Sequence, residues 1–568
     1  MRVDSSGRTC LSILRVSSGS LHYKKRSSKS ASLGLLGIIV LLATLTACGG
    51  SAAAPVQQGD QNPPPLAQHT AVTTYRNDNA RTGANLTETT LTPSNVSAVG
   101  FGKLAAVPVQ GDVFAQPLYV PAVRIGNREP RNLIIVATEH DQVYAIDANT
   151  HAIVWHKDFL GTGGTVATLS PSDVLGCLLI APEIGITGTP VIDMSTLTIY
   201  LVVATKEMQN GQLSYYQRIH ALGLTTGEDK LTPTTITSPP DPNGLFGAAR
   251  YDPQVNNQRA ALLLVDQQIY VAWASNCDLG VYQGWVMSFD SGTLQLTGAW
   301  TADPSGESGG IWMGGAGPAA DAAGDIYLAV GNGLSDAMIG GTNYGDSIVR
   351  LRHSTDQISA LDYFIPFDWE TLFDEDLDLG SGGPLLLPDQ PGTAHPHLLT
   401  VTGKDGTVYL LDRDNLGHWQ PDNDGEVVQS FKPSSGRCFC NPAVWNDTIY
   451  FGWMGGPVEG FHLDPIQEQM TTSPVTTTGN LTNGYPGVSP SISADGSSNG
   501  ILWVLENMGP SAELRAFDAH DLSKQLYDSG WSQLRDGGGP SATFSVPTVA
   551  DGLVFVGTRG ELDIYGLL

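Results

Sequence analysis

Short apolar runs alternate with clusters of turn-forming residues along most of the chain. Val, Ile, Leu and Tyr dominate the runs, whereas Gly, Pro, Asp and Asn dominate the clusters. No long segment has apolar residues spaced at the period of a helix, and runs of this length between turns are typical of strands. Residues 132–138 and 141–147 would form two strands joined by a tight turn, with a third strand at 153–155. The pattern therefore predicts an all-β protein.

The same unit recurs, and a fixed repeat decides the architecture. We count eight units, whose first strands begin near residues 132, 198, 268, 325, 398, 448, 501 and 553. A single unit leaves one face of its sheet exposed, so neighbouring units must stack, and closing the stack into a ring removes the open edges. We expect residues 71–568 to form a single eight-bladed β-propeller. Two packed all-β domains would instead need a linker near the middle of the chain, and none is visible.

The two ends of this repeat region complement each other. The last unit ends at Leu568 without an outer strand, and residues 102–109 form an apolar run that has no partner before the first unit. We therefore expect the ring to close by pairing of this N-terminal strand with the C-terminal blade.

The first 47 residues have the three parts of an export signal. A basic segment is followed by an uncharged apolar stretch at 31–47 and then by Leu45-Thr46-Ala47-Cys48, which resembles the lipobox of bacterial lipoproteins. We expect residues 1–47 to be a signal peptide, Cys48 to be lipidated, and residues 48–70, rich in Ala, Ser, Pro and Gln, to be a flexible linker. The alternative is an uncleaved membrane anchor, although the stretch is shorter than the roughly 20 residues that a spanning helix needs. The expected location is extracytoplasmic, on the outer face of the cell membrane.

The charge balance narrows the range of partners. The chain has 29 Lys and Arg against 56 Asp and Glu, a formal net charge of −27. Binding to nucleic acid or to anionic lipid needs clustered basic residues, and none is present. We expect no nucleic-acid partner, contact with the membrane through the lipid anchor only, and a monomer.

Export changes the interpretation of the cysteines. The part of the chain after the linker contains Cys177, Cys277, Cys438 and Cys440. Outside the cytoplasm four cysteines indicate disulfides, with three possible connectivities. We favour Cys177–Cys277 with a tight Cys438–Cys440 pair. The alternative, a metal site, lacks CxxC spacing and nearby paired histidines.

Two turns predicted at equivalent places in the ring contain candidate ligand-binding residues. Glu139, His140 and Asp141 lie at the first hairpin turn, where a histidine between two acids could act as a base or a ligand. Lys404 and Asp405 lie at the analogous turn of the fifth unit. The alternative for both turns is a set of solvated charges without a function.

A third segment concentrates carboxylates. Asp374, Asp376 and Asp378 alternate as in a calcium-binding loop, but the glycine is one position late and Leu385 stands where a closing glutamate is needed. Turn capping and solubility are the alternative roles.

Arg259 and Trp312 lie just before predicted innermost strands. They could offer a charge clamp and a stacking surface to an anionic planar ligand. Equally, they could plug the channel.

The repeats resemble a known family. Residues 145–150, followed by Trp155, are similar to the AxDxxTGxxxW repeat of quinoprotein propellers, with His151 in place of the glycine. Residues 71–568 as a whole resemble bacterial PQQ-binding-like β-propeller repeat proteins. The resemblance implies PQQ and Ca²⁺ as cofactors to consider. PQQ alcohol dehydrogenases typically have adjacent cysteines, a stacking Trp and a Glu/Asn/Asp calcium set. This chain has Cys438-Phe439-Cys440 instead, and no calcium set can be aligned.

Three functions follow from these observations. The first is a non-catalytic scaffold at the cell surface, which binds a protein or a small molecule at the channel mouth. The second is a PQQ- and calcium-dependent dehydrogenase acting on an alcohol or sugar. The third is a propeller that binds or cleaves glycans, for which paired carboxylates should face the channel.

Overall fold

The computed structural model describes residues 70–161, 163–306, 308–434, 436–479, 481–506 and 509–568, which all belong to one compact unit. The expected signal peptide, the lipidation site Cys48 and almost all of the linker lie outside these residues. Among the described residues, no helix is both long and apolar enough to cross a membrane.

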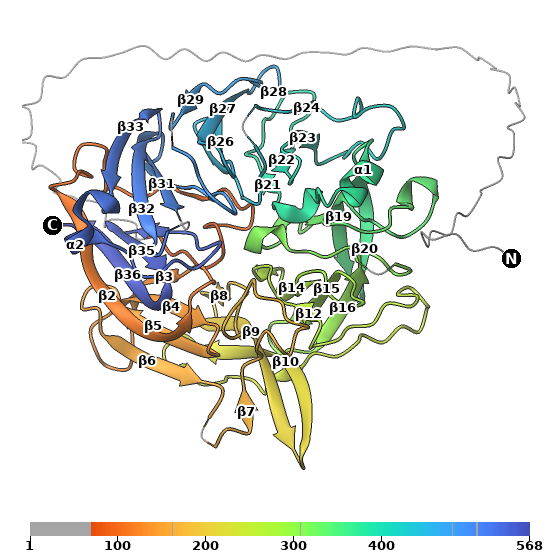
Figure 1. Ribbon diagram of the computed structural model, residues 1–568, viewed down its shortest axis with the longest axis horizontal. Coiled ribbons are helices and arrows are strands. Elements are labelled where there is room, and N and C mark those ends of the chain that lie inside the picture. The colour runs from red at the N-terminus through yellow and green to blue at the C-terminus, as the bar shows by residue number, and fades with distance from the viewer. Residues whose placement is uncertain (1–69, 162, 307, 435, 480, 507–508) are drawn as a thin grey trace, which may run out of the picture. The chain divides into compact units, whose positions relative to one another are not determined.

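Eight antiparallel sheets follow one another around a ring, so the fold is an eight-bladed β-propeller, as the sequence predicts (Figure 1). The first four blades are built as follows. Blade 1 contains β3 (Leu118–Val123), β4 (Arg131–Thr138), β5 (Gln142–Asp147) and β6 (Ile153–Asp158). Blade 2 contains β7 (Val166–Ala167), β8 (Val191–Asp193), β9 (Thr198–Gln209), β10 (Gln212–Gly223) and β11 (Thr234–Thr235). Blade 3 contains β12 (Asn256–Asn257), β13 (Leu263–Val265), β14 (Gln268–Ser275), β15 (Trp285–Asp290) and β16 (Leu296–Thr301). Blade 4 contains β17 (Ala319–Ala320), β18 (Ile326–Val330), β19 (Ser347–Ser354) and β20 (Gln357–Phe364).

The other four blades complete the ring. Blade 5 contains β21 (Leu385–Leu386), β22 (Leu398–Thr402), β23 (Val408–Asp412) and β24 (Gln429–Phe431). Blade 6 contains β25 (Ala443–Trp445), β26 (Thr448–Gly452), β27 (Val458–Asp464), β28 (Gln469–Met470) and β29 (Thr476–Thr477). Blade 7 contains β30 (Ser491–Asp495), β31 (Ser498–Glu506), β32 (Glu513–Asp518) and β33 (Asp521–Asp528), with β1 (Ala84–Asn85) parallel to β30. Blade 8 contains β34 (Thr548–Ala550), β35 (Leu553–Gly557), β36 (Arg559–Leu567) and β2 (Phe101–Asp112). Short α-helices lie at α1 (Trp369–Asp374) and α2 (Gln533–Asp536), and single 3-10 turns at Met313–Gly315, Ala337–Ile339, Leu379–Ser381 and Ser529–Ser532.

The ring closes through its two ends, which confirms the pairing expected from residues 102–109. Strand β2 runs antiparallel to β36, with Phe101 opposite Leu567 and Val107 opposite Leu562. Phe101 is fully buried, and its ring centroid lies 5.4 Å from that of Trp503 in blade 7. The closing strand therefore also fills the apolar interface between the last two blades.

Residues 72–88, which we call the N-terminal strap, follow the inner strands of all eight blades. Hydrogen bonds link the strap to each blade in succession: Val72 with Tyr119, Thr73 with Ile192, Asn79 with Leu264 and Ala320, Ala80 with Leu386, Thr82 with Val444, Gly83 with Ile492, and Asn85 with Val549. Because inner strands surround the central channel of a propeller, the strap fills part of that channel.

Two arginines hold the strap in place. Arg76 donates to the carbonyl oxygens of Pro442 (2.6 Å) and Pro490, and Arg81 donates to that of Pro318 (2.8 Å). Burial lowers the pKa of each guanidinium to about 10, so both remain charged at neutral pH. Gly83 has φ +68°, and a Cβ there would lie 2.1 Å from Nη2 of Arg76. Only glycine therefore leaves room for that guanidinium.

Candidate functional site

A pocket of about 340 Å³ lies among the loops that lead into the inner strands. Most of its walls come from loops of different blades, so residues far apart in sequence face one space. The polar and charged lining residues include Asn257, Arg259, Asn276, Asp278, Asp378, Ser381, Lys404 and Arg559; the aromatic and aliphatic ones include Phe114, Leu178, Leu179, Ile180, Trp312, Phe439, Tyr485 and Phe544. Its volume is within the range of small-molecule sites.

Arg259 is the deepest cation of this pocket, with 8% of its surface exposed. Its Cζ atom lies 4.9 Å from the ring centroid of Phe544 and 5.8 Å from that of Phe114. A Cβ at residue 315 would lie 3.0 Å from the same Cζ, so Gly315 permits this close approach. Nη2 is buried and has no hydrogen-bond partner among the described residues. Burial lowers the pKa of Arg259, and the nearby Tyr75, Glu139 and Tyr485 oppose that decrease.

Trp312 presents a flat ring to the same pocket. Its indole N–H donates to the carbonyl of Ser275 (3.2 Å), and Tyr282 packs edge-on against it at 5.8 Å. A Cβ at Gly310 or Gly331 would lie within 2.4 or 2.9 Å of the ring, so the two glycines allow the indole to lie flat against the backbone. The ring is therefore fixed before any ligand arrives.

Lys404 lies between two carboxylates of the segment that follows α1. Its ammonium pairs with Asp376 at 2.5 Å and with Asp378. Burial raises the pKa of Asp378, and the contact with Lys404 opposes that rise. Burial disfavours the charged ammonium, but the two carboxylates raise the pKa of Lys404 above its usual value. This loop is therefore an ion-paired wall of the pocket.

The segment with Asp374, Asp376 and Asp378, for which the sequence allowed a calcium loop or turn capping, contains an ion pair. Asp374 is the last residue of α1, and Lys404 takes the position between the other two carboxylates. Across the described ranges, no group of three or more His, Cys, Asp or Glu side chains is arranged to hold a metal ion.

The turn at Glu139, His140 and Asp141 is not a solvated loop. Glu139 and Asp141 are fully buried, whereas His140 pairs with Glu183 at 2.8 Å. Oε2 of Glu139 accepts hydrogen bonds from the Gly185 N–H (2.7 Å) and Thr187 (3.0 Å), and Oε1 has no partner among the described residues. Burial raises the pKa of Glu139 to about 7 and raises that of Asp141 well above its usual value.

The structure thus separates the candidates from the sequence into two groups. Arg259, Trp312 and Lys404 line one pocket, whereas Glu139, His140, Asp141 and Asp405 do not. Asp405 instead accepts a hydrogen bond from the Thr407 backbone N–H at 3.1 Å within its own turn. Glu139 still acts on the pocket through its charge, which raises the pKa of Arg259.

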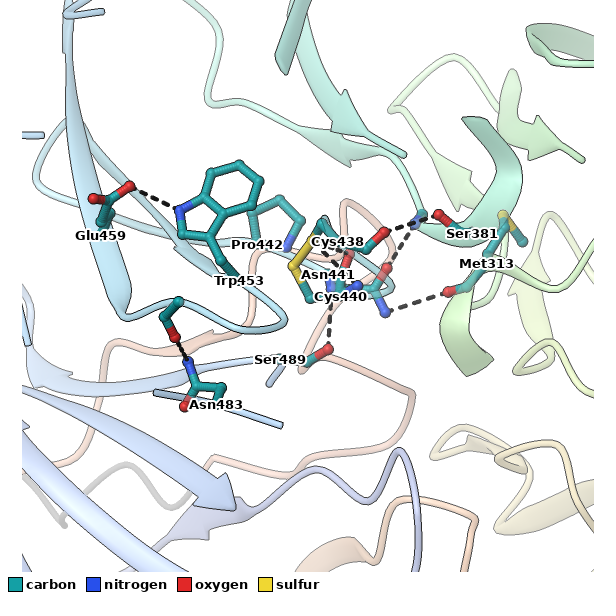
Figure 2. The surroundings of a disulfide bond; sticks show 12 residues. Met313, Ser381, Cys438, Cys440, Asn441, Pro442, Trp453, Glu459, Asn483 and Ser489 are labelled. Carbon is teal, nitrogen blue, oxygen red and sulfur yellow. Dashed lines mark hydrogen bonds between the residues drawn. A yellow bond between two sulfur atoms is a disulfide. The ribbon is translucent and has the colours of Figure 1, made fainter. Parts of the chain in front are cut away.

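Both disulfides favoured from the sequence are present. Cys177–Cys277 joins two loops of the pocket wall, and Cys438–Cys440 flanks Phe439. Figure 2 shows that the second cystine is embedded among polar contacts between blades. The carbonyl of Cys438 accepts from Ser381 (2.9 Å), and Asn441 donates to the carbonyl of Met313 (3.3 Å). These contacts fix the segment that presents Phe439 to the pocket.

Several lining residues were not found from the sequence. Phe439 could have been found from its place between two cysteines. Asp278, Tyr485 and Phe544 lie in loops without periodicity, and Asn257 lies in the two-residue strand β12. Two carboxylates, Asp278 and Asp378, line the pocket, and paired carboxylates are what a glycan-binding or glycan-cleaving propeller would present. Each of them already has a partner, however: Asp278 contacts Tyr282, and Asp378 pairs with Lys404.

No protein-family model matches the chain, and no curated protein does so either. Among solved structures, it is similar to a quinohemoprotein alcohol dehydrogenase from Comamonas testosteroni, with 13% identity over 88% of this chain and 80% of that one, at a TM-score of 0.57. It is also similar to a europium-containing methanol dehydrogenase, with 12% identity over 88% of this chain and 98% of that one, again at 0.57. A quinohemoprotein alcohol dehydrogenase from Pseudomonas putida HK5 has 13% identity, coverage of 88% and 80%, and a TM-score of 0.53. At such identities the likeness establishes the fold, and the resemblance inferred from the repeats is confirmed at that level.

Proposed function

We propose that the protein is a ligand-binding propeller whose pocket takes a planar, anionic aromatic molecule. The main support is Arg259, whose buried Nη2 has no partner among the described residues and whose guanidinium contacts the rings of Phe114 and Phe544. A buried polar group without a partner costs about 1–3 kcal/mol, and a ligand carboxylate would remove that cost. Trp312 offers a flat surface in the same pocket, so charge and stacking are available together.

Pyrroloquinoline quinone (PQQ) has this chemistry, because it is a fused-ring quinone with three carboxylates. Arg259 would hold a carboxylate, Asn257 lies beside it as a further polar lining group, and Trp312 would contact a face of the ring system. The names of the similar solved structures, quinohemoprotein and methanol dehydrogenases, support PQQ as the first compound to test.

The experiment is a titration of purified protein with PQQ, followed by calorimetry and tryptophan fluorescence. Citrate, a tricarboxylate that is not planar, and phenazine, a planar molecule without charge, are the matched controls. We expect PQQ to bind more tightly than either control by tenfold or more, about 1.4 kcal/mol. Equal binding of PQQ and citrate, or no binding of PQQ, would show that the proposal is wrong.

The binding role is non-catalytic in this proposal, and a dehydrogenase acting on an alcohol or sugar is the second candidate. One observation favours the second candidate: Asp378 lines the pocket beside Trp312, and its pKa is raised by burial. A carboxylate of this kind could take a proton from a substrate hydroxyl. PQQ, when bound, would supply a two-electron acceptor.

The second candidate, a dehydrogenase, would also depend on Ca²⁺. Oδ1 of Asn332 is buried without a partner among the described residues, and the Asn332 N–H donates to Asp378 at 2.6 Å. These side chains could contribute oxygen ligands, which Ca²⁺ prefers, although Lys404 already occupies one side of Asp378. Dye reduction with PQQ, with and without Ca²⁺, over a panel of alcohols and sugars separates the two candidates. Robust turnover establishes the dehydrogenase, whereas PQQ binding without turnover supports the non-catalytic role.

We also propose that the ring is held outside the cytoplasm by a lipid on Cys48. The lipobox-like sequence supports this proposal, as do two disulfides in the ring, because disulfides persist in oxidising compartments.

A further inference from the structure

The buried acid Glu139 and the buried cation Arg259 both contact the short segment 112–114. The backbone N–H of Glu139 donates to the carbonyl of Asp112 at 2.9 Å. The Cζ atom of Arg259 lies 5.8 Å from the ring centroid of Phe114, two residues further along. Arg259 and Phe114 line the pocket, whereas Glu139 does not. One segment therefore links an acid outside the pocket to the cation inside it.

A second segment makes the same connection. The carboxylate of Glu139 accepts a hydrogen bond from the Gly185 N–H at 2.7 Å. Three residues further along, a Cβ at Gly188 would lie 2.4 Å from the side chain of Gln258, the neighbour of Arg259. The acid is thus attached on two sides to the surroundings of the cation.

The acid and the cation interact without a hydrogen bond between them. Oε1 of Glu139 and Nη2 of Arg259 are buried, and neither has a hydrogen-bond partner among the described residues. The two residues are 0% and 8% exposed, so little water screens their charges. Burial raises the pKa of Glu139 to about 7 and lowers the pKa of Arg259, and in each case the opposite charge of the other residue acts against burial.

An anionic ligand at Arg259 would bring a second negative charge close to Glu139. Like charges in a weakly screened region repel each other, and protonation of one of them removes the repulsion. Glu139 changes from neutral to charged around pH 7, whereas ligand carboxyl groups, with an ordinary pKa near about 4, stay charged above pH 6. Glu139 therefore opposes an anion when it is charged and admits one when it is neutral.

We propose that Glu139 is the internal counter-ion of Arg259, and that an anionic ligand replaces it in this role. As the ligand carboxylate becomes the partner of Arg259, Glu139 takes up a proton from the solvent. This inference rests on the proposed role of the pocket as a site for a planar anion, and it adds the regulation of that site by pH.

Other charged and titratable groups belong to the same region. They are Asp141 on the same turn, Asp112 at the end of β2, Asp158 at the end of β6 and Glu183 in the loop before β8, together with Arg559 near Asp112 and His140 paired with Glu183. Asp112 raises the pKa of Glu139 through its like charge, as a ligand carboxylate would. Because several groups share this region, only a variant of Glu139 can assign a pH dependence to it.

The test is calorimetric titration of wild type and Glu139→Gln with PQQ at pH 6 and pH 8.5. A rise of one unit in the pKa of Glu139 corresponds to about tenfold in affinity. We therefore expect wild type to bind PQQ about five- to tenfold more weakly at pH 8.5 than at pH 6. Glu139→Gln should bind about five- to tenfold more tightly than wild type at pH 8.5 and nearly equally at pH 6.

Proton uptake gives a second measurement. Titrations at pH 7.5 in buffers of different ionisation enthalpy should show that wild type takes up part of a proton when PQQ binds, whereas Glu139→Gln takes up none. A purely structural role of Glu139 would instead weaken binding in the variant at both pH values and leave proton uptake unchanged.

Glu88→Gln is the matched control. Glu88 is also buried, at 2% exposure, and also accepts backbone hydrogen bonds, but it neither lines the pocket nor belongs to the groups that act on Arg259. This variant should keep the affinity and the pH profile of wild type. Thermal unfolding confirms that both variants fold.

Two simpler probes separate charge from shape. Benzene-1,3,5-tricarboxylate is planar and anionic, and its triamide has the same ring without charge. The tricarboxylate should bind with the pH dependence expected of PQQ, and this dependence should disappear in Glu139→Gln. The affinity of the triamide should be the same at pH 6 and pH 8.5.

Three results would overturn the inference: equal affinities of wild type for the anions at the two pH values, a pH dependence that persists in Glu139→Gln, or weaker binding by Glu139→Gln at both pH values. PQQ binding together with any of these results rejects this inference alone. A pH profile of the tricarboxylate that depends on Glu139, without PQQ binding, rejects PQQ as the ligand alone. If neither anion binds, both the planar anionic ligand and this regulation are rejected.

Discussion

The guanidinium of Arg259 lies over the ring of Phe544, with 4.9 Å between Cζ and the ring centroid. This contact holds a buried cation that lacks a full set of hydrogen-bond partners. Because a hydrogen bond to a charged group contributes about 1.5–3 kcal/mol, Arg259→Gln should weaken PQQ binding at least about tenfold in calorimetry.

Arg250→Gln is the control for this experiment, because Arg250 is an exposed arginine that does not line the pocket. It should leave the affinity for PQQ unchanged. Equal affinities of wild type and Arg259→Gln would remove the main support for the anionic ligand.

Glu139 predicts a pH dependence of stability. Its folded-state pKa of about 7 lies above the ordinary value of 4.5 because of burial, so the folded state binds this proton more tightly than the unfolded state does. The resulting stabilisation is present below pH 4.5 and is lost as the pH rises through about 7. The loss amounts to about 3 kcal/mol at most. Glu139→Gln should remove this contribution, which urea unfolding at a series of pH values would measure.

Asp112, Asp141 and Glu183 belong to the same group of interacting acids. The quantity that reports on Glu139 is therefore the difference in the free energy of unfolding between wild type and variant at each pH. Glu129→Gln, at an exposed position, should leave the profile unchanged. A constant difference between wild type and Glu139→Gln from pH 4 to 8 would contradict the raised pKa.

Removal of each disulfide should affect a different property: the first should lower thermal stability, and the second should weaken ligand binding. Cys177–Cys277 closes a loop with a sequence separation of 100, for which the chain-entropy model gives about 4.7 kcal/mol, whereas Cys438–Cys440 spans only 2. Replacing the first pair by serines should therefore lower the melting temperature far more than replacing the second. The second replacement should instead weaken PQQ binding severalfold, because it frees the segment that holds Phe439 at the pocket. Equal melting temperatures of the two variants would count against this division of roles.

Substitution of Gly83 in the N-terminal strap should lower the stability of the protein. Gly83→Ala places a methyl group 2.1 Å from Nη2 of Arg76 and demands a positive φ, so we expect a loss of about 2 kcal/mol or more in urea unfolding. Gly244→Ala isolates the backbone effect, because Gly244 has φ +69° and open space around it. If both variants lost the same stability, the contact with Arg76 would not matter.

Much of the fold could be predicted from the sequence because each blade repeats a local pattern. The runs at 132–138 and 141–147 became β4 and β5, and the pairing of 102–109 with the last blade followed from a missing strand. The N-terminal strap could not be predicted, because its hydrogen bonds with the eight blades follow no sequence period.

The pocket was predicted only in part, for a physical reason. Arg259, Trp312 and Lys404 were found because a charge or an indole just outside a strand is conspicuous in a sequence. Phe544 and Asp278 come from irregular loops whose position depends on the closed ring. Glu139 and Asp141 look like a solvated turn in the sequence, and only the ring around them makes them buried.

The lipid anchor at Cys48 is the last prediction and can be tested independently of the pocket. Cys48→Ser should abolish incorporation of a labelled fatty acid and release the protein from washed membranes. The net charge of −27 gives the protein no attraction of its own for anionic lipid, so acyl chains would supply most of the binding. Cys10→Ser, within the expected signal peptide, is the control and should stay membrane-bound. PQQ affinity should be the same in wild type and Cys48→Ser, because the pocket is formed by residues far from position 48 in the chain. If Cys48→Ser protein remained in the membrane with the mass of the uncleaved chain, the segment at 31–47 would be a membrane anchor and the lipoprotein proposal would be wrong.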